Sequence, residues 1–270
     1  MEEIRVTASE SKESWTLPVL YEDEDLFALS KPSRLLTSPD RYDPGRPNLM
    51  RLLHEAVERG APWARQRRLS YLMNSHRLDF ETSGLLLLAK NKPALINLAN
   101  LFGIQKPLKK YAALVHGTPA QKEFQVDAKL ALHPTKPGRT RVDHKSGKLS
   151  TTNFVVREIF TGCSLLHCFP LTGRTHQIRV HLTYASHPVI GDALYGGRPL
   201  MLSGLKPGYR LKPGRTENPL IDRVALHAES ITLPHPRTGE MITIEAPWPK
   251  DLTVAVRYLR RYATPYVPPA

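Results

Sequence analysis

The sequence lacks an apolar run long enough to span a bilayer, and its first residues are acidic and polar, without the apolar core of a signal peptide. We therefore expect a cytoplasmic protein that does not associate with membranes. Cysteine is also scarce, because the 270 residues include only Cys163 and Cys168. Their odd spacing within an expected strand points them to opposite faces, which predicts buried thiols rather than a disulfide or a metal pair.

Acidic residues are few outside the first 25 positions. The chain has 38 Lys and Arg against 25 Asp and Glu, a formal charge of +13, but residues 1–25 alone hold eight of the acids and two of the bases. The remainder of the chain is therefore strongly cationic. Such a body favours a polyanionic partner such as nucleic acid, although a basic composition also occurs in enzymes of phosphorylated metabolites.

The pattern of apolar residues predicts alternating groups of strands and helices. Residues 1–14 show no periodicity, so we expect a flexible tail before Trp15. Strands are expected at 17–31 as a hairpin, then at 84–90, 109–116, 123–132, 152–160 and 164–171, and as a closing hairpin at 225–247. Helices are expected at 47–58, 92–105, 174–186 and 251–263.

This order of elements is neither a regular strand-helix alternation nor all-β. It predicts an α+β fold with a mixed, largely antiparallel sheet flanked by helices. We find no internal repeat and no linker, so we expect a single domain over residues 15–263 with a short tail at 264–270.

The most unusual segment is HRLDFETSGLLLLAK at 76–90, in which polar residues lead directly into an apolar strand. Asp79 in this segment has two interpretations. Its carboxylate could simply cap the turn, with Gly84 supplying a permissive backbone angle. Alternatively, Asp79 could be a nucleophile at the edge of a cleft, kept ionised by a nearby cation. Spacing alone does not decide between these interpretations.

Four ordered motifs carry a resemblance to a known family. Residues 76–84 resemble the HRLD-x-x-TSG signature of the RluA family of pseudouridine synthases, with Phe80 and Glu81 at the variable places. The other three motifs are KKYAALVHG at 109–117, LTGRTHQIRVHL at 171–182 and HPVIGDALYGG at 187–197. The opening and closing hairpins are also similar, so the resemblance covers about residues 17–248.

The resemblance implies an isomerase, an intramolecular transferase that converts uridine to pseudouridine in structured tRNA or rRNA. It assigns the catalytic carboxylate to Asp79, its cationic partner to Arg179 and the active-site tyrosine to Tyr111. The reaction needs no redox change and no energy input, so neither a cofactor nor a metal is implied. No protein partner is implied either, and we expect a monomer.

The RNA contacts are also inferred from these motifs. The target base must leave its stack, and Arg77 beside Asp79 could fill the vacated space. Cations near a groove position RNA through phosphates and sugars without reading bases. The candidates for such contacts are Lys109, Lys110, Arg174 and His176.

Two departures from the family pattern affect substrate binding. Arg34 occupies a place where similar proteins generally have Gly, which puts the backbone angle of that loop in doubt. Many relatives also carry a small RNA-binding domain before the catalytic domain, whereas the residues before Trp15 are too few for such a fold. We therefore expect the catalytic domain itself to bind the substrate.

Two other classes of function compete with this interpretation. A metal-dependent hydrolase is suggested by His176, His181 and His187 with Asp192 close behind, but the five-residue spacing of the first two differs from the i, i+4 pair of a zinc helix. A non-catalytic RNA-binding protein of the same fold would also fit the basic charge. Retention of Asp79, Tyr111 and Arg179 argues against this second alternative.

Overall fold

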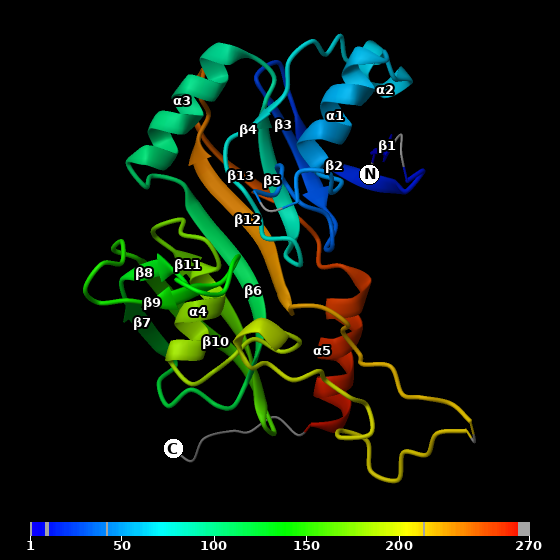
Figure 1. The fold of residues 1–270 in the computed structure, drawn as a ribbon, viewed down its shortest axis with the longest axis vertical. Coiled ribbons are helices and arrows are strands. Elements are labelled where there is room, and N and C mark those ends of the chain that lie inside the picture. Colours follow the sequence, from blue (N-terminus) through cyan, green and yellow to red (C-terminus); the bar gives the residue numbers. More distant parts are fainter. Residues whose placement is uncertain (1, 9–10, 42, 213, 264–270) are drawn as a thin grey trace. The chain divides into compact units, whose positions relative to one another are not determined.

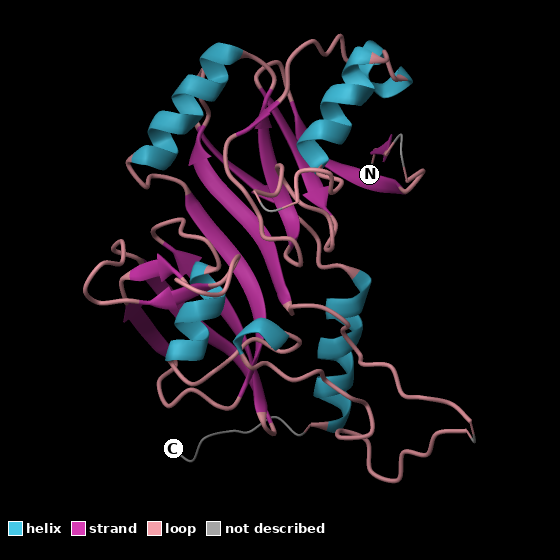
Figure 2. Cartoon of the chain, in the orientation of Figure 1, coloured by secondary structure: helices cyan, strands magenta, loops and turns pink. Residues whose placement is uncertain are grey.

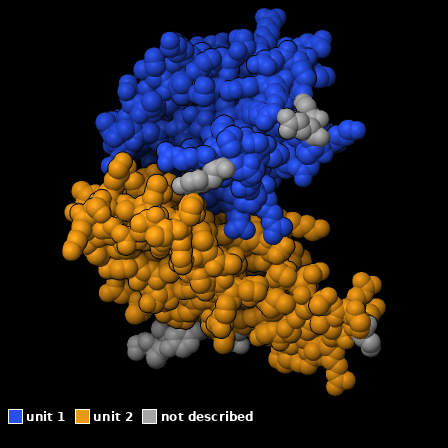
Figure 3. All heavy atoms as spheres, viewed as in Figure 1, with its two compact units in different colours: residues 1–109, 228–247 blue, residues 110–227, 248–270 orange. Residues whose placement is uncertain are grey.

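The computed structural model describes residues 2–8, 11–41, 43–212 and 214–263. The chain forms two compact units. Unit 1 contains Met1–Lys109 and Ala228–Pro247, and unit 2 contains Lys110–His227 and Trp248–Ala270 (Figure 3). The chain passes between the units three times, first within strand β6 (Leu108–His116), then within strand β12 (Leu226–Pro234), and last after Pro247.

Unit 1 is built on strands that pair mostly antiparallel, with two long helices (Figure 1). Its strands follow the order β1-β2-β3-β5-β12, with β4 paired to β5 and β13 paired to β12. These elements are β1 (Glu3–Thr7), β2 (Ser14–Glu22), β3 (Leu26–Lys31), α1 (Leu49–Glu58), α2 (Pro62–Gln66), β4 (Met73–Asn74), β5 (Ser83–Ala89), α3 (Lys92–Gly103) and β13 (Met241–Glu245).

Strand β5 is central in unit 1 because apolar residues cover both of its faces. Leu86 and Leu88 pack in one cluster with α1, whereas Leu85 and Leu87 pack in a second cluster with α3. Successive side chains on a strand point to opposite faces, so a run of four leucines buries both. The continuous apolar run therefore predicted this strand correctly, and the polar residues of the motif lie just before its N-terminal end.

The N-terminal segment corrects one expectation. Residues 3–7 are not a flexible tail but form β1, which pairs antiparallel with β2. Ile4 and Val6 are each 1% exposed and alternate with three exposed residues. Such alternation with a period of two residues indicates a strand, and the prediction of a flexible tail did not take it into account.

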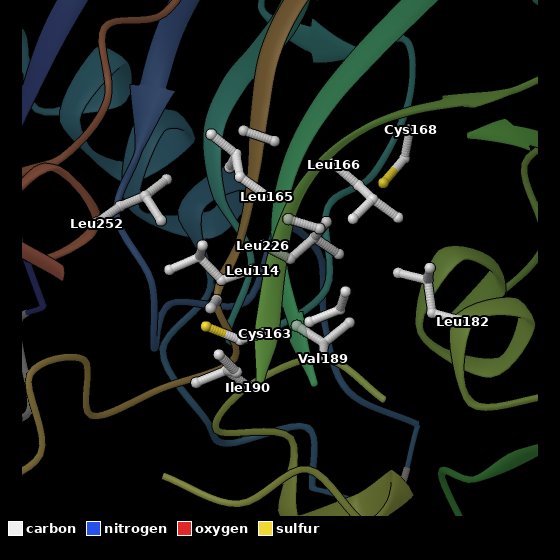
Figure 4. Close-up of a cluster of buried hydrophobic side chains, with 14 of the residues drawn as sticks. Leu114, Cys163, Leu165, Leu166, Cys168, Leu182, Val189, Ile190, Leu226 and Leu252 are labelled. Atoms are coloured by element: carbon white, nitrogen blue, oxygen red, sulfur yellow. The ribbon is translucent and has the colours of Figure 1, made fainter. Parts of the chain in front are cut away.

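Unit 2 contains the strands β6-β11-β10-β7 of the 11-stranded sheet, which pair antiparallel in that order, and a separate two-stranded sheet of β8 and β9. Strands are drawn in magenta in Figure 2. Its elements besides β6 are β7 (Glu123–Asp127), β8 (Leu130–Leu132), β9 (Thr140–Val142), β10 (Thr151–Phe160), β11 (Cys163–Pro170), α4 (Gln177–Tyr184), the 3-10 helix η1 (Ala193–Tyr195) and α5 (Lys250–Tyr262). One hydrophobic cluster joins the sheet to α4 and α5 (Figure 4). Both cysteines are buried in this cluster with free thiols, as expected.

The expected fold class is confirmed, with small differences at element ends. The expected strand at 123–132 is divided into β7 and β8, and the helix expected from residue 174 begins at Gln177. The expected tail at 264–270 lies outside the described residues, and the single domain over 15–263 stays a prediction. Among the described residues, no helix is both long and apolar enough to cross a membrane.

Candidate active site

Asp79 lies on the loop between β4 and β5 in unit 1 and is half-buried. Its carbonyl accepts a hydrogen bond from the Thr82 amide at 3.2 Å, which closes a tight turn around Phe80 and Glu81. Two residues after Thr82, Gly84 has φ +113°, and a Cβ there would collide with the backbone of Ala228 in β12. Only glycine fits this position, which explains the last letter of the TSG motif.

The loop of residues 32–37 clamps the backbone on both sides of Asp79. The Thr37 hydroxyl donates to the Leu78 carbonyl at 3.0 Å and accepts from the Leu78 amide at 3.1 Å. The Arg34 amide donates to the Phe80 carbonyl at 2.7 Å. Thr37 is 1% exposed, so its two bonds to Leu78 are shielded from water. The residues flanking Asp79 are therefore fixed by a neighbouring loop.

The loop of residues 32–37 is itself held by a buried lysine and contains one residue with a strained backbone angle. The ammonium of the fully buried Lys31 donates to the carbonyls of Pro32 and Leu35, each at 2.7 Å. Arg34 has φ 60°, in the left-handed region where a Cβ is unfavourable. The backbone angle of this loop was in doubt because arginine replaces glycine. Arg34 adopts a left-handed angle, which glycine would adopt more readily.

His76 and Arg77 precede Asp79 on the same loop and have different environments. The Leu87 amide donates to His76 Nε2 at 3.0 Å, and the ring stacks on Phe102 with centroids 5.4 Å apart. Burial, and then the charge of Lys109, lower the pKa of His76 to about 3, so the ring is neutral at physiological pH. Arg77 is exposed, which suits a residue that contacts RNA.

Two of the predicted RNA contacts, Lys109 and Lys110, are half-buried on β6. Burial lowers the pKa of Lys109 to about 8, so this lysine loses part of its charge just above neutral pH. Tyr111 follows on the same strand, opposite Cys168 of β11, and packs partly buried against the hydrophobic cluster of unit 2. The structure thus gives Tyr111 one apolar face against the core.

Arg179 is not a solvated helix residue but is 4% exposed on α4. Its Nε donates to Asp192 Oδ2 at 2.6 Å and its Nη2 donates to Asp192 Oδ1 at 2.8 Å, and Asp192 is fully buried. This is the two-pronged geometry that favours arginine over lysine. The expected partner of Arg179 was Asp79 of unit 1, and that pairing stays a prediction.

Tyr195 of η1 connects Arg179 with His176. The Arg179 guanidinium carbon lies 5.0 Å from the centroid of the Tyr195 ring. The Tyr195 hydroxyl accepts from the Thr140 amide at 2.9 Å and lies 2.8 Å from His176 Nδ1. His176 has φ 53° at the start of α4, an unusual angle for a residue with a side chain. Unit 2 therefore brings two of the predicted site residues to one tyrosine.

The exposed Arg174 lies on the loop before α4. Its amide donates to the Gln177 side-chain oxygen at 2.9 Å and its Nε donates to the Leu149 carbonyl at 3.3 Å. These bonds fix the loop while leaving most of the guanidinium at the surface. The arrangement suits the predicted contact with a phosphate.

The histidines of the competing metal hypothesis each have a separate role. His181 is fully buried, with its two ring nitrogens 3.1 Å from the Ser150 hydroxyl and 3.0 Å from the Thr152 hydroxyl. Burial lowers the pKa of His181, which keeps the ring neutral. His187 Nδ1 lies 3.1 Å from the His116 carbonyl. Asp192 is engaged by Arg179, so these residues do not form a common ligand set.

Sequence reasoning considered Asp192 only as a possible metal ligand and missed Tyr195 and Thr37, although all three residues shape the site. The first two belong to the HPVIGDALYGG motif, and a carboxylate inside an apolar motif was a signal that its partner had to be a buried cation. Thr37 carried no comparable signal, since its partner Leu78 is 41 residues away in the sequence.

Comparison with protein families agrees with the motifs. The model of the family described as RNA pseudouridylate synthase matches residues 25–184. The chain is 35% identical over 244 residues to "Ribosomal large subunit pseudouridine synthase D" of Haemophilus ducreyi, covering 90% of this chain and 71% of that protein. It is 36% identical over 246 residues to "Ribosomal large subunit pseudouridine synthase C" of Salmonella typhi, covering 91% and 70% respectively.

Solved structures show the same fold. Human RNA Pseudouridylate Synthase Domain Containing 4 superposes with a TM-score of 0.67 at 22% identity and covers 90% of this chain and 92% of that chain. Human RNA Pseudouridylate Synthase Domain Containing 1 gives 0.63 at 25% identity, with 93% and 89% covered. The ordered motifs, the family match and the shared fold agree, and the chain belongs to the RNA pseudouridylate synthases of the RluA type, which are isomerases.

Proposed function

We propose that this protein converts uridine to pseudouridine in ribosomal large-subunit RNA, with Asp79 as its catalytic carboxylate. The observation that carries the assignment of Asp79 is the clamp on Leu78 and Phe80, which holds the backbone on both sides of this acid. Catalysis requires a reacting group to be held in one geometry before the substrate arrives. A residue that merely capped the turn would not need bonds from a second loop.

The chemistry needs only groups that the chain supplies. The bond between ribose C1′ and uracil N1 breaks, the base turns, and C1′ bonds to C5 instead. N1 gains a proton and C5 loses one, so atoms and charge balance without an oxidant, reductant or nucleotide. Asp79 assists the first step, either by adding to the substrate or by removing the ribose 2′ proton.

Arg179 and Tyr111 serve the same reaction. The guanidinium of Arg179 stabilises negative charge on the reacting carboxylate, and its pair with Asp192 sets the orientation of the guanidinium. Tyr111 presents its ring to uracil and its hydroxyl to the proton transfer at C5. Both residues come from motifs that resemble those of the family.

Substrate binding uses cations around these residues. The uridine leaves its stack at a cost of a few kcal/mol, and exposed Arg77 fills the space it leaves. Lys109, Lys110, Arg174 and His176 contact the phosphates and sugars around it. Ribosomal RNA is the substrate we favour, because the bacterial relatives reported above are named for the large ribosomal subunit.

The experiment incubates the protein, with a chelator present, with large-subunit ribosomal RNA transcripts and separately with unmodified tRNA. Pseudouridine is then mapped at nucleotide resolution. We expect modification at a defined position of the ribosomal RNA and none in tRNA. Modification of tRNA alone would contradict the choice of substrate. Binding of RNA without any pseudouridine would favour the non-catalytic alternative and contradict the enzyme assignment.

A further inference from the structure

A basic and aromatic surface lies on unit 2, on elements other than those that carry the residues assigned to the reaction. Its members share an outward position on the C-terminal half of α5 or on the neighbouring segment of residues 198–215. We call it the α5 face, and it consists of Lys206, Arg257, Tyr258, Arg261 and Tyr262. Figure 1 shows α5 in red, with the chain after residue 198 looping out beside it in yellow.

The two aromatic rings of the α5 face are stacked, and cationic side chains lie over them. Tyr258 and Tyr262 are one helical turn apart, with ring centroids 5.9 Å apart and planes inclined by 17°. The guanidinium carbon of Arg257 lies 5.9 Å from the Tyr258 centroid. Arg261 lies 5.3 Å and the Lys206 ammonium 5.9 Å from the Tyr262 centroid. These contacts align planar groups and positive charges along the helix.

The amphipathic pattern of α5 explains why these residues face outward. The side chains of Leu252, Ala255, Val256 and Leu259 are fully buried in the cluster of unit 2, so the opposite side of the helix faces outward. Arg257 and Arg261 are exposed in the structure. The α5 face is therefore a consequence of helical spacing in this segment.

Acidic residues are few in the two segments that form the α5 face. Residues 198–215 contain five Lys and Arg and no Asp or Glu, and α5 contains four Lys and Arg with Asp251 as its single acid. Asp251 is already paired with Arg223, with Nε–Oδ2 at 2.6 Å. Arg260 is held by Glu158 and is not counted in the face. The face therefore retains a concentrated positive charge.

We propose that the α5 face binds RNA that flanks the target uridine, an inference that rests on the proposed function. The charge suits the phosphate backbone, and tyrosine rings beside guanidinium groups suit unpaired bases, which stack on such planes. None of the residues predicted to contact RNA from the motifs belongs to this face. It is a second contact that adds affinity for longer RNA and lets the fold select substrates by the structure around the uridine.

The test compares two double variants that remove equal charge from exposed helix surfaces. Arg257→Gln with Arg261→Gln alters the α5 face, whereas Arg51→Gln with Arg59→Gln alters two exposed arginines of unit 1, one on α1 and one at its C-cap. Affinity is measured over a salt series for a long ribosomal RNA fragment and for a short stem-loop with the same uridine. Thermal unfolding of both variants verifies that each retains its fold.

We expect the α5 variant to lose about tenfold in affinity for the long RNA, and less for the short one. Its slope of log affinity against log salt should fall by about two, one for each lost phosphate contact. The α1 variant should bind both RNAs like the wild type. Equal losses from both variants, or no loss from the α5 variant, would overturn the inference. Pseudouridine formation by the wild type on the same RNAs tests the proposed function separately.

Discussion

The Asp79 loop of unit 1 and the Arg179 helix of unit 2 are held in place by opposite means. Hydrogen bonds to backbone atoms of Leu78 and Phe80 fix the loop, and none of these bonds draws on the Asp79 carboxylate. Arg179 is fixed through its own charged group, by two bonds to the buried Asp192. The loop is therefore positioned through backbone groups, whereas Arg179 depends on a second charge for its position.

The two arrangements also differ in the free energy of unfolding that is lost when one partner of an interaction is removed. A neutral hydrogen bond contributes about 0.5–1.5 kcal/mol, and its loss leaves unpaired backbone groups. A buried ion pair adds little net stability but is costly to break, because the remaining charge stays desolvated. Removing one member of the Arg179–Asp192 pair should consequently destabilise the protein more than removing the Thr37 hydroxyl.

The largest effect should follow Asp192→Asn. This change keeps the shape of the side chain but leaves the Arg179 guanidinium buried without its counter-charge, so we expect a loss of about 3–5 kcal/mol in unfolding free energy. Urea denaturation measures it. The double variant Arg179→Met with Asp192→Leu replaces both charges by apolar groups and should regain most of that stability without activity. A single variant as stable as the wild type would show that the pair is solvated.

A smaller effect should follow Thr37→Val in the Asp79 loop. Valine has the shape of threonine but cannot bond to the Leu78 amide and carbonyl, so we expect a loss of about 1–3 kcal/mol in unfolding free energy and a slower single-turnover rate. Thr37→Ser keeps the hydroxyl and should retain most of both. If serine and valine reduce the rate equally, the hydroxyl does not position Asp79.

Arg34→Gly should act in the stabilising direction. Arg34 holds φ 60°, which a residue with a Cβ adopts at a cost, and glycine relieves that cost while losing more chain entropy on folding. We expect a net gain of about 0.5–1 kcal/mol in unfolding free energy. Arg34→Ala removes the same side chain but retains the Cβ, so it should not gain stability. A gain shared by both variants would assign the effect to the arginine side chain instead.

The smallest effect should be a pH dependence that comes from Lys109. Its folded pKa is lowered to about 8 from 10.5, so the folded protein loses this charge as pH rises through 8. RNA affinity should then fall between pH 7 and pH 9, whereas the burial penalty on folding is relieved as pH rises from about 8 to 10.5. Lys109→Met should flatten that part of the affinity profile, and Lys110→Met should not. An identical profile in Lys109→Met would remove Lys109 from the RNA contacts.

The sequence predicted what local patterns and motifs determine. The run of leucines before Ala89 identified a strand buried on both faces, and the spacing in α5 identified an amphipathic helix. Motif resemblance selected Asp79, which spacing alone had left open. Strand β1 was missed because its alternation extends over only five residues.

Long-range partners could not be predicted from local patterns. Asp192 reaches Arg179 only through the packing of η1 against α4, and Thr37 reaches Leu78 only because two loops meet in the fold. The left-handed angles of Arg34 and His176 likewise run against the preference of residues with a Cβ. Such angles persist only when the surroundings enforce them, and here they occur beside residues assigned to the reaction.

The most direct test of the account is the single-turnover rate of pseudouridine formation by Asp79→Asn, with Glu81→Gln as a matched control on the same turn. Both changes neutralise one carboxylate and nearly preserve its shape. We predict that Asp79→Asn retains the RNA affinity and unfolding midpoint of the wild type but less than about a thousandth of its rate, whereas Glu81→Gln retains most of the rate. A larger residual rate in Asp79→Asn, or an equal loss in Glu81→Gln, would contradict the role of Asp79 as the catalytic carboxylate.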